Sequence, residues 1–404
     1  MVEMKEICYF NSNDGSGILG FGVNDYIRID IIPCLEKLQE FIDKHNGKYI
    51  FGALNYNLKN EIDSLNSRKK DSVEFPNILF WVPKYVVKIK NEHFEFLQGE
   101  KNEESFTFLN DFLEEEMDMN FHMLKNEIKA RTSKENYFND VRNIKALLQR
   151  GDIYEVNYCQ EYFAENIDIK FPLDLYFKLN NIAKAPFSSY FKFDEFLVFC
   201  NSPERYINYQ EGKLISQPIK GTSARNSDKT IDESNKSDLK NNPKERSENI
   251  MIVDLVRNDL SKIAEKDSVK VDELCEIYTF PTVHQMISTV SCIPKVNTSF
   301  TDILRATFPM GSMTGAPKIS AMKIIDEQED FNRGLYSGSL GYISPDGSFD
   351  FNVVIRSLIY NSNKKYLSCA VGSAITILSD EEKEYEECQF KIEKLLSVLR
   401  ANEN

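Results

Sequence analysis

The sequence is poor in the residues that build metal-centred or disulfide-bonded folds. It has four histidines, one tryptophan and eight cysteines in 404 residues. The cysteines are scattered, with no C-x-x-C pair and no short cluster of cysteine and histidine. This spacing favours neither a zinc site nor a disulfide framework, and we expect most of the cysteines to be small buried hydrophobic residues.

The sequence also lacks long apolar runs and an excess of positive charge. No apolar segment reaches membrane-spanning length, and the first residues, Met-Val-Glu-Met-Lys-Glu, do not resemble a signal peptide. Lysine and arginine number 49 against 63 acidic residues, which gives a net charge of −14. This acidity disfavours nucleic acid and anionic membranes as partners. We therefore expect a cytoplasmic protein that binds neither nucleic acid nor membrane.

The length and the hydrophobic content of 42% allow a large core. A chain of this length predicts two or three domains, or one large interwoven domain. The first hundred residues are β-rich, with strands expected at 48–51 and 78–82 and a helix at 32–45. A charged, acidic segment follows from 99 to 134. We place the boundary there: residues 1–131 form an N-terminal β-rich region with an acidic connector, and residues 132–404 form the catalytic domain.

One glycine-rich segment imitates a nucleotide-binding motif. Gly15-Ser16-Gly17-Ile18-Leu19-Gly20 matches G-x-G-x-x-G, but no helix pattern follows it. A dinucleotide fingerprint needs a strand, a tight turn and a helix N-terminus together. We predict a flexible turn here and no dinucleotide site.

The second region opens with a helix that has clear boundary signals. Thr132-Ser133-Lys134-Glu135 has the pattern of a capping box, apolar residues recur at helical spacing after it, and Gly151 suits the C-cap. A strand at 152–163, a helix near 172–182 and strands near 190–199 and 213–217 follow. The final helix is expected from about 380 to 399.

Lys220 lies in Gln217-Pro218-Ile219-Lys220-Gly221-Thr222, between an apolar strand and a glycine turn. Gly221 permits backbone conformations that other residues resist, so the lysine is positioned by the turn. Burial among apolar groups would lower the pKa of the amine and leave it uncharged and nucleophilic. The alternative is a surface lysine before a turn.

Two helices carry acidic residues beside apolar ones. The helix that begins at Asn242-Pro243 places Glu248 and Asp259 on one face with apolar neighbours, and the final helix carries Glu384 and Glu387 near its start. Ordinary ion pairs are the alternative: Asp254 or Asp259 with Arg257, and Glu387 with Lys391 four residues on.

Three further segments have the character of a binding site. The turn Gly311-Ser312-Met313-Thr314-Gly315-Ala316-Pro317-Lys318 precedes a helix and favours an anion, a carboxylate rather than a triphosphate, because its spacing is not that of a P-loop. Arg356 lies in an apolar strand, so it either faces a carboxylate partner or points into a site. His284 is also in an apolar strand, where a histidine is more often a satisfied core residue.

These segments together resemble the chorismate-utilising enzymes. Ser202-Pro203-Glu204-Arg205, P-I-K-G-T, M-I-V-D-L-V-R-N-D-L, G-S-M-T-G-A-P-K, Y-S-G-S-L-G-Y and the helix with Glu384 and Glu387 occur in the family's order, over about residues 132 to 399. The resemblance implies an α+β fold of large stacked antiparallel β-sheets flanked by helices, with an interwoven N-terminal β-rich part.

Two positions indicate the branch of the family. Aminodeoxychorismate synthases have P-I-K-G-T where anthranilate synthases have P-I-A-G-T, and this chain has Lys220. Isochorismate-type members carry a water-activating lysine where this chain has Glu155. The resemblance therefore implies component I of aminodeoxychorismate synthase, which makes 4-amino-4-deoxychorismate for p-aminobenzoate and folate synthesis. Anthranilate synthase component I is the alternative.

The resemblance also implies roles for single residues. Lys220 adds to the chorismate ring, Glu204 is the general acid, and Glu248 and Glu387 hold Mg²⁺. The substrate contacts that the family pattern implies are His284, Ser312, Thr314, Tyr336, Arg356, Gly372 and Ser373. The resemblance further implies a separate glutamine amidotransferase subunit as the source of ammonia, since we expect no glutaminase domain within these residues. Ser373 and Ala374 replace a more glycine-rich loop, so that wall of the site is expected to differ in shape.

Overall fold

A computed structural model describes residues 4–67, 69–91, 93–114 and 128–399 of the chain. The strands within these ranges pair antiparallel throughout. They are β1 (Ile7–Asn11), β2 (Ser16–Ile29), β3 (Ile50–Leu54), β4 (Ile78–Lys90), β5 (His93–Gln98), β6 (Lys129–Ala130), β7 (Glu155–Glu165), β8 (Phe187–Phe193), β9 (Phe196–Ser202), β10 (Arg205–Gln210), β11 (Lys213–Gln217), β12 (Ile219–Ala224), β13 (Lys270–Thr279), β14 (Val283–Cys292), β15 (Gly315–Ala316), β16 (Ser339–Ile343), β17 (Phe349–Asn352), β18 (Ser357–Asn361) and β19 (Tyr366–Ile375).

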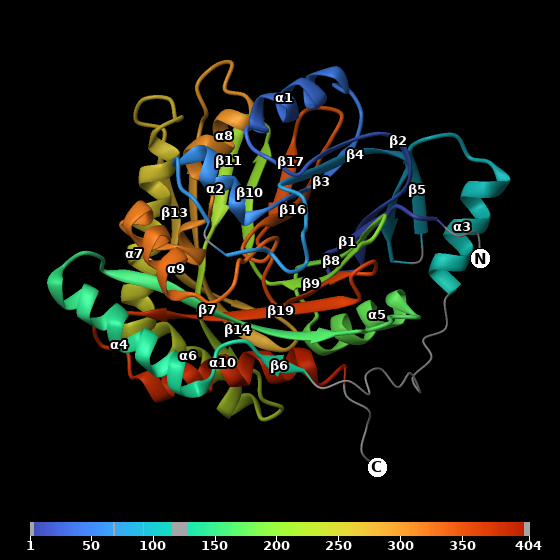
Figure 1. Ribbon diagram of the computed structural model, residues 1–404. Helices are drawn as coiled ribbons and strands as arrows, with labels where there is room; N and C mark the ends of the chain where they lie inside the picture. The colour runs from blue at the N-terminus through green and yellow to red at the C-terminus, as the bar shows by residue number, and fades with distance from the viewer. Residues whose placement is uncertain (1–3, 68, 92, 115–127, 400–404) are drawn as a thin grey trace, which may run out of the picture.

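Helices flank this sheet system (Figure 1). They are α1 (Leu35–Lys44), α2 (Lys59–Ile62), α3 (Glu103–Glu114), α4 (Lys134–Arg150), α5 (Pro172–Ala183), α6 (Lys229–Asn241), α7 (Pro243–Ser261), α8 (Phe300–Thr307), α9 (Lys318–Gln328) and α10 (Glu381–Leu396), with short 3₁₀ turns at Tyr56–Leu58 and Gly311–Met313. In Figure 1, α4, α5 and α10 lie below the layer that contains β7 and β19, and α7, α8 and α9 lie above it in the left half of the view. The predicted α+β class, with antiparallel sheets flanked by helices, is confirmed.

The strand pairings run as one continuous path through both halves of the chain. From β13 the path passes through β14, β11, β10, β17 and β16 to β3, then through β4, β2, β1, β8, β9, β18 and β19 to β7. The pairs β3–β16 and β1–β8 hydrogen-bond the N-terminal strands to later ones. The N-terminal part is therefore interwoven as expected, while the division at residue 132 stays a prediction.

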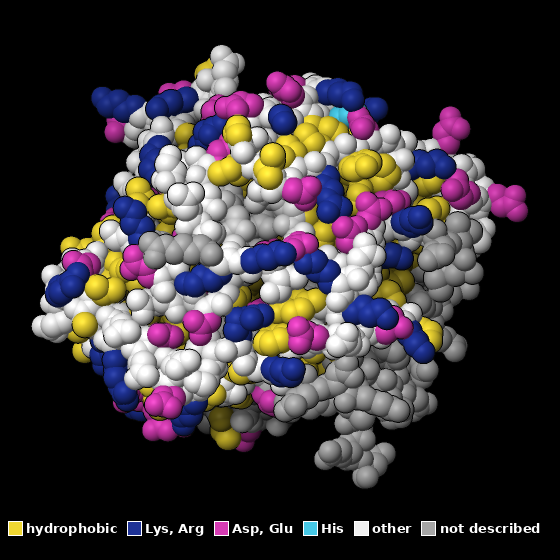
Figure 2. All heavy atoms as spheres, in the orientation of Figure 1, with side chains coloured by type: hydrophobic (Ala, Val, Ile, Leu, Met, Phe, Trp, Pro, Cys, Tyr) yellow, Lys and Arg dark blue, Asp and Glu magenta, His cyan; other side chains and the backbone are white. Residues whose placement is uncertain are grey.

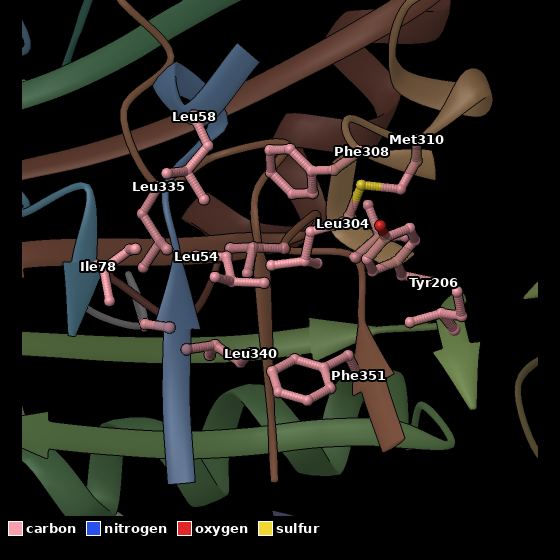
Figure 3. Close-up of a cluster of buried hydrophobic side chains, with 14 of the residues drawn as sticks. Leu54, Leu58, Ile78, Tyr206, Leu304, Phe308, Met310, Leu335, Leu340 and Phe351 are labelled. Atoms are coloured by element: carbon pink, nitrogen blue, oxygen red, sulfur yellow. The ribbon is translucent and has the colours of Figure 1, made fainter. Parts of the chain in front are cut away.

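The main hydrophobic core lies where these two parts meet. Leu54 and Ile78 of the N-terminal strands lie next to Leu335 and Leu340 of the C-terminal half (Figure 3). All eight cysteines are buried and free, which confirms their prediction as small hydrophobic residues. Burying large apolar side chains from both halves in one cluster makes the halves depend on each other for stability.

Local signals set several element boundaries as predicted. Ser133 caps α4 by accepting a hydrogen bond from the backbone of Asn136, and Gly151 ends the helix at a φ of 82°. Asn242 caps α7, with Pro243 at its first position. These helices begin and end where the sequence indicates because capping is local chemistry.

The prediction for the glycine-rich segment near the N-terminus is partly wrong. Residues from Ser16 onward belong to β2, a strand of 14 residues, and not to a flexible turn. A Cβ on Gly20 would lie 2.4 Å from the ring of Phe51, so this glycine makes room for an aromatic neighbour. The glycines therefore serve close packing of the sheet.

The surface shows no single dominant charge on the face seen in Figure 2, where basic and acidic side chains alternate among the coloured residues. Within the described ranges, no helix combines the length and the apolar character needed to cross a membrane.

Candidate active site

Lys220 is placed by an irregularity in its strand. The pairing of β12 with β14 shifts register between Ile219 and Thr222, so Lys220 and Gly221 form a bulge. Gly221 has a φ of +83°, which a residue with a side chain rarely adopts. Bulges redirect side chains, and here the lysine side chain turns inward and is only 12% exposed. The alternative of a surface lysine is therefore excluded.

The lysine contacts a carboxylate from a distant part of the chain. Lys220 Nζ donates a hydrogen bond to Glu155 Oε1 over 2.8 Å. Glu155 is the first residue of β7 and its side chain is 1% exposed. Its second oxygen, Oε2, is buried without a hydrogen-bond partner. The sequence marked Glu155 as a replacement for another family member's lysine but did not indicate this pairing; a carboxylate in a strand with so many buried positions was the available signal.

The charge on Lys220 differs from the prediction. Burial alone would lower the pKa of the amine, but the carboxylates of Glu155, Glu248 and Glu204 outweigh it and raise the pKa above its ordinary value. Lys220 is therefore a protonated ammonium in the free protein. The expectation of an uncharged lysine was wrong because the amine is surrounded by carboxylates and not by apolar groups.

Glu204 lies just after β9 and is buried. Burial raises its pKa to about 7, although the Ser312 hydroxyl and the Lys220 ammonium act to lower it. Ser312 Oγ donates a hydrogen bond to Glu204 Oε1 over 2.6 Å. A carboxyl group that titrates near neutral pH can give up and regain a proton, which suits a general acid.

Arg356 faces the same carboxyl group. Its backbone has a φ of +50°, a rare conformation for a residue with a side chain. Burial lowers the pKa of its guanidinium, and the nearby Glu204 opposes this shift. Among the described residues, no hydrogen bond or ion pair engages the guanidinium. A half-buried, unpaired arginine held by a strained backbone is prepared to bind an anion.

The two acidic helices come together beside the lysine. Burial raises the pKa of Glu248 to about 7, and Glu248 Oε1 is buried without a hydrogen bond. Lys244 Nζ lies 3.2 Å from Glu384 Oε1 and 3.8 Å from Glu248 Oε1, which links α7 to α10. Within the described residues, no three acidic, histidine or cysteine side chains form a complete metal cluster.

Glu387 forms an ion pair with Lys391, which the sequence analysis gave as the alternative to metal binding. Its carboxylate lies 2.6 Å from Lys391 Nζ and is 47% exposed. Burial acts to raise its pKa, but Lys391 and Lys244 lower it below the ordinary value. Of the other sequence alternatives, Asp254 pairs with Arg257 over 2.8 Å. Asp259 instead pairs with Lys262 and Lys318.

The remaining predicted contacts are close to these groups but are engaged by the protein. Thr314 Oγ1 donates to the Met310 carbonyl over 3.1 Å. Tyr336 OH lies 4.0 Å from Cys159 Sγ. Ser373 Oγ lies 3.1 Å from Tyr137 OH. A Cβ on Gly372 would lie 2.5 Å from Cys159 Sγ, so glycine is required there for the strands to approach.

His284 is a fully partnered buried histidine. Its ring nitrogens lie 3.0 Å from Thr279 Oγ1 and 3.0 Å from Asp232 Oδ1. Asp232 also pairs with Arg225, whose guanidinium holds the carboxyl pKa well below its usual range. This geometry is that of a structural histidine, and a substrate contact by His284 stays a prediction.

Of two cavities, the smaller one adjoins the site. One of about 20 Å³ adjoins Glu204 and Ser312, room for about one water molecule. A larger hollow of about 530 Å³ lies between α1 and the segment 293–300, and none of the predicted site residues lines it.

The arrangement combines a lysine, an acid of near-neutral pKa, an unpaired arginine and carboxylates on two helices. A family model for chorismate binding enzymes matches residues 7–397. This chain belongs to that family.

Individual relatives agree with the family assignment. The chain is 40% identical over 273 residues to "Aminodeoxychorismate synthase component 1" of Klebsiella aerogenes, covering 68% of this chain and 60% of the relative. It is 39% identical over 263 residues to the protein of the same name from Salmonella typhimurium, covering 65% and 57%. The matches thus span about 60% of the length of these curated relatives.

A solved structure supports the fold over almost the whole chain. Anthranilate synthase component I from Streptococcus pneumoniae superposes with a TM-score of 0.80 at 25% identity, covering 95% of this chain and 92% of that one.

Proposed function

We propose that this chain is the chorismate-converting component of an aminodeoxychorismate synthase. It would turn chorismate and ammonia into 4-amino-4-deoxychorismate, the precursor of p-aminobenzoate for folate synthesis. The observation that carries the proposal is the buried Lys220 ammonium, held at a strand bulge among Glu155, Glu204 and Glu248. The relatives of 39–40% identity named aminodeoxychorismate synthase support the same reaction.

The residues suit the two halves of such a reaction. Once deprotonated, Lys220 attacks ring carbon C2 while Glu204 protonates the departing C4 oxygen, which leaves as water. Ammonia then attacks C4 and the lysine leaves. The unpaired Arg356 guanidinium binds a substrate carboxylate, and Ser312 holds Glu204 toward the reacting oxygen.

We further propose that Mg²⁺ binds between α7 and α10, held by Glu248 and Glu387. The orphaned Oε1 of Glu248 and the carboxylates of α10 are hard oxygen donors that suit this ion, which takes few protein ligands. The Glu387–Lys391 ion pair would have to open for this. An ion held there by Glu248 and Glu387 would supply positive charge for a substrate carboxylate.

A separate glutamine amidotransferase is the proposed source of ammonia. The relatives are named "component 1", which indicates that those proteins act with another component. We propose the same arrangement for this chain, with free ammonium as a poorer substitute.

Anthranilate synthase component I is the second candidate, favoured by the 0.80 TM-score to that enzyme from S. pneumoniae. Incubation of the purified protein with chorismate, Mg²⁺ and ammonium, followed by chromatography and mass spectrometry, separates the two. We expect 4-amino-4-deoxychorismate without pyruvate. Release of pyruvate with fluorescent anthranilate would overturn the proposal in favour of the second candidate.

A further inference from the structure

We propose that Glu155 is the proton acceptor of Lys220: it takes the proton that the lysine must lose before its nitrogen attacks the substrate, and returns it when the lysine is released. This inference rests on the proposed function, since it concerns the covalent step of that reaction. The family resemblance assigned Glu155 no role beyond the absence of a water-activating lysine.

The need for a proton acceptor follows from the charge on the lysine. The carboxylates around Lys220 hold its amine as an ammonium, which has no lone pair and is not a nucleophile. A base in direct contact has to remove one proton after the substrate binds. The lysine side chain is only 12% exposed, so a protein group in direct contact with the amine is the best-placed base.

The contacts select Glu155 from the surrounding carboxylates. It is the group that hydrogen-bonds Lys220 Nζ, over 2.8 Å, so the proton has a direct path. The corresponding contact of Glu204 is with Ser312, and that of Glu248 is the longer approach of Lys244. Neither Glu204 nor Glu248 therefore hydrogen-bonds the Lys220 amine directly.

The second carboxylate oxygen of Glu155 can hold the proton that Lys220 loses. Oε2 is buried and has no hydrogen-bond partner. Native proteins rarely leave a buried carboxylate oxygen unpaired without a functional reason. A neutral carboxyl group costs less to bury than an isolated carboxylate, so the proton can stay on Glu155 once the lysine has lost its charge.

The proton and electron balance is complete with chorismate and ammonia as the reactants. The Lys220 ammonium passes a proton to the Glu155 carboxylate; the amine lone pair forms the bond to C2, both ring double bonds shift by one position (C1=C2 to C1=C6 and C5=C6 to C4=C5), and the C4–O bond breaks. Glu204 supplies the proton that lets this oxygen leave as water. Ammonia then bonds to C4, both ring double bonds shift back, and the C2–N bond electrons return to Lys220. Glu155 gives its proton back to the amine, and the new C4 ammonium gives one to Glu204.

The test compares Glu155→Gln with the wild-type chain in the presence of chorismate and Mg²⁺. Glutamine keeps the shape and an acceptor oxygen for Lys220 but cannot take a proton. Steady-state assays with ammonium give kcat and KM, and intact-mass spectrometry without ammonium follows the Lys220 adduct, which adds chorismate minus water. We expect kcat and the rate of adduct formation to fall about 100-fold or more, with the KM for chorismate changed less than about 3-fold.

Two further variants control for structure. Glu161→Gln makes the same substitution on the same strand, at a buried carboxylate bonded to Tyr366 and Ser368, and should leave kcat unchanged. If Glu155→Gln fails to fold, Glu155→Asp and Glu155→Asn repeat the comparison with a shorter side chain, and only the aspartate should retain adduct formation.

The outcomes separate this inference from the proposed function. Wild-type rates in Glu155→Gln, an effect on KM alone, or equal activity of the aspartate and asparagine variants would each overturn the role of Glu155 while leaving the proposed reaction standing. A wild-type chain that forms neither product nor adduct from chorismate would overturn the proposed function, and this inference with it.

Discussion

Two buried ion pairs touch strand β7, and they differ in how completely they are bonded. Arg333 and Glu329 are each 1% exposed. Arg333 donates to both oxygens of Glu329 and also to the carbonyl groups of Met313 and Asn157. Glu329 Oε1 accepts a further bond from the backbone of Cys159. This pair uses nearly all of its hydrogen-bonding capacity to join α9, β7 and the turn before β16.

The Lys220–Glu155 pair is less completely bonded and less buried, with Lys220 12% exposed and Glu155 1% exposed. It has one bond between its partners, and Glu155 Oε2 has none. A saturated pair resists change, because any movement leaves a charge unpaired. A pair with spare capacity can change its protonation state at lower cost. The difference distinguishes a pair that holds the fold from one that is available for chemistry.

Lys220→Ala should give the largest effect on activity and a small one on stability. We expect product formation from chorismate and ammonium to fall at least about 1000-fold, because the attacking nitrogen is gone. One hydrogen bond joins Lys220 to Glu155, and Lys220 is 12% exposed, so the thermal unfolding midpoint should fall less than when the Arg333–Glu329 pair is broken. The double variant Lys220→Met/Glu155→Gln, which has no charge at either position, is the stability control. Full activity of Lys220→Ala would contradict covalent catalysis.

Arg333→Ala should instead have its main effect on stability. Removing the guanidinium leaves Glu329 buried without its main partner, and breaking such a pair costs about 3–5 kcal/mol of the free energy of unfolding. Urea unfolding followed by circular dichroism measures this loss. Replacing both partners, as in Arg333→Met/Glu329→Leu, should recover part of it. If Arg333→Ala is as stable as the wild type, the Arg333–Glu329 pair does not hold the fold as proposed.

Sequence reasoning predicted what depends on neighbouring residues. Ser133 and Gly151 define α4, and Asn242 defines α7, because caps act within a few positions of the chain. The fold class followed from the order of the motifs. The prediction for residues 16–20 was wrong because the space that Gly20 provides is filled by Phe51 of β3, a residue distant in sequence.

The sequence proposed candidate site residues, but it did not indicate which of them contact one another. Lys220 and Glu155 are separated by 65 positions, and only the fold shows that they touch. The charge of the lysine depends on carboxylates from several elements, so its local apolar context was misleading. His284 likewise depends on Asp232, which lies on α6, 52 positions away. Pairwise electrostatics of this kind cannot be read from a motif.

The smallest effect concerns Ser312 and the acid that it contacts. Because the pKa of Glu204 is about 7 in the free protein, the activity that needs its protonated form should decline as pH rises above about 7. The Ser312 hydroxyl lowers that pKa, so Ser312→Ala should raise it and move the basic limb of the kcat/KM profile to higher pH, by about one unit or less. The rate at neutral pH should change less than about 10-fold. Glu204→Gln is the matched control: its residual activity should show no such limb, whereas a shift of the Ser312→Ala limb to lower pH would mean that another group controls it.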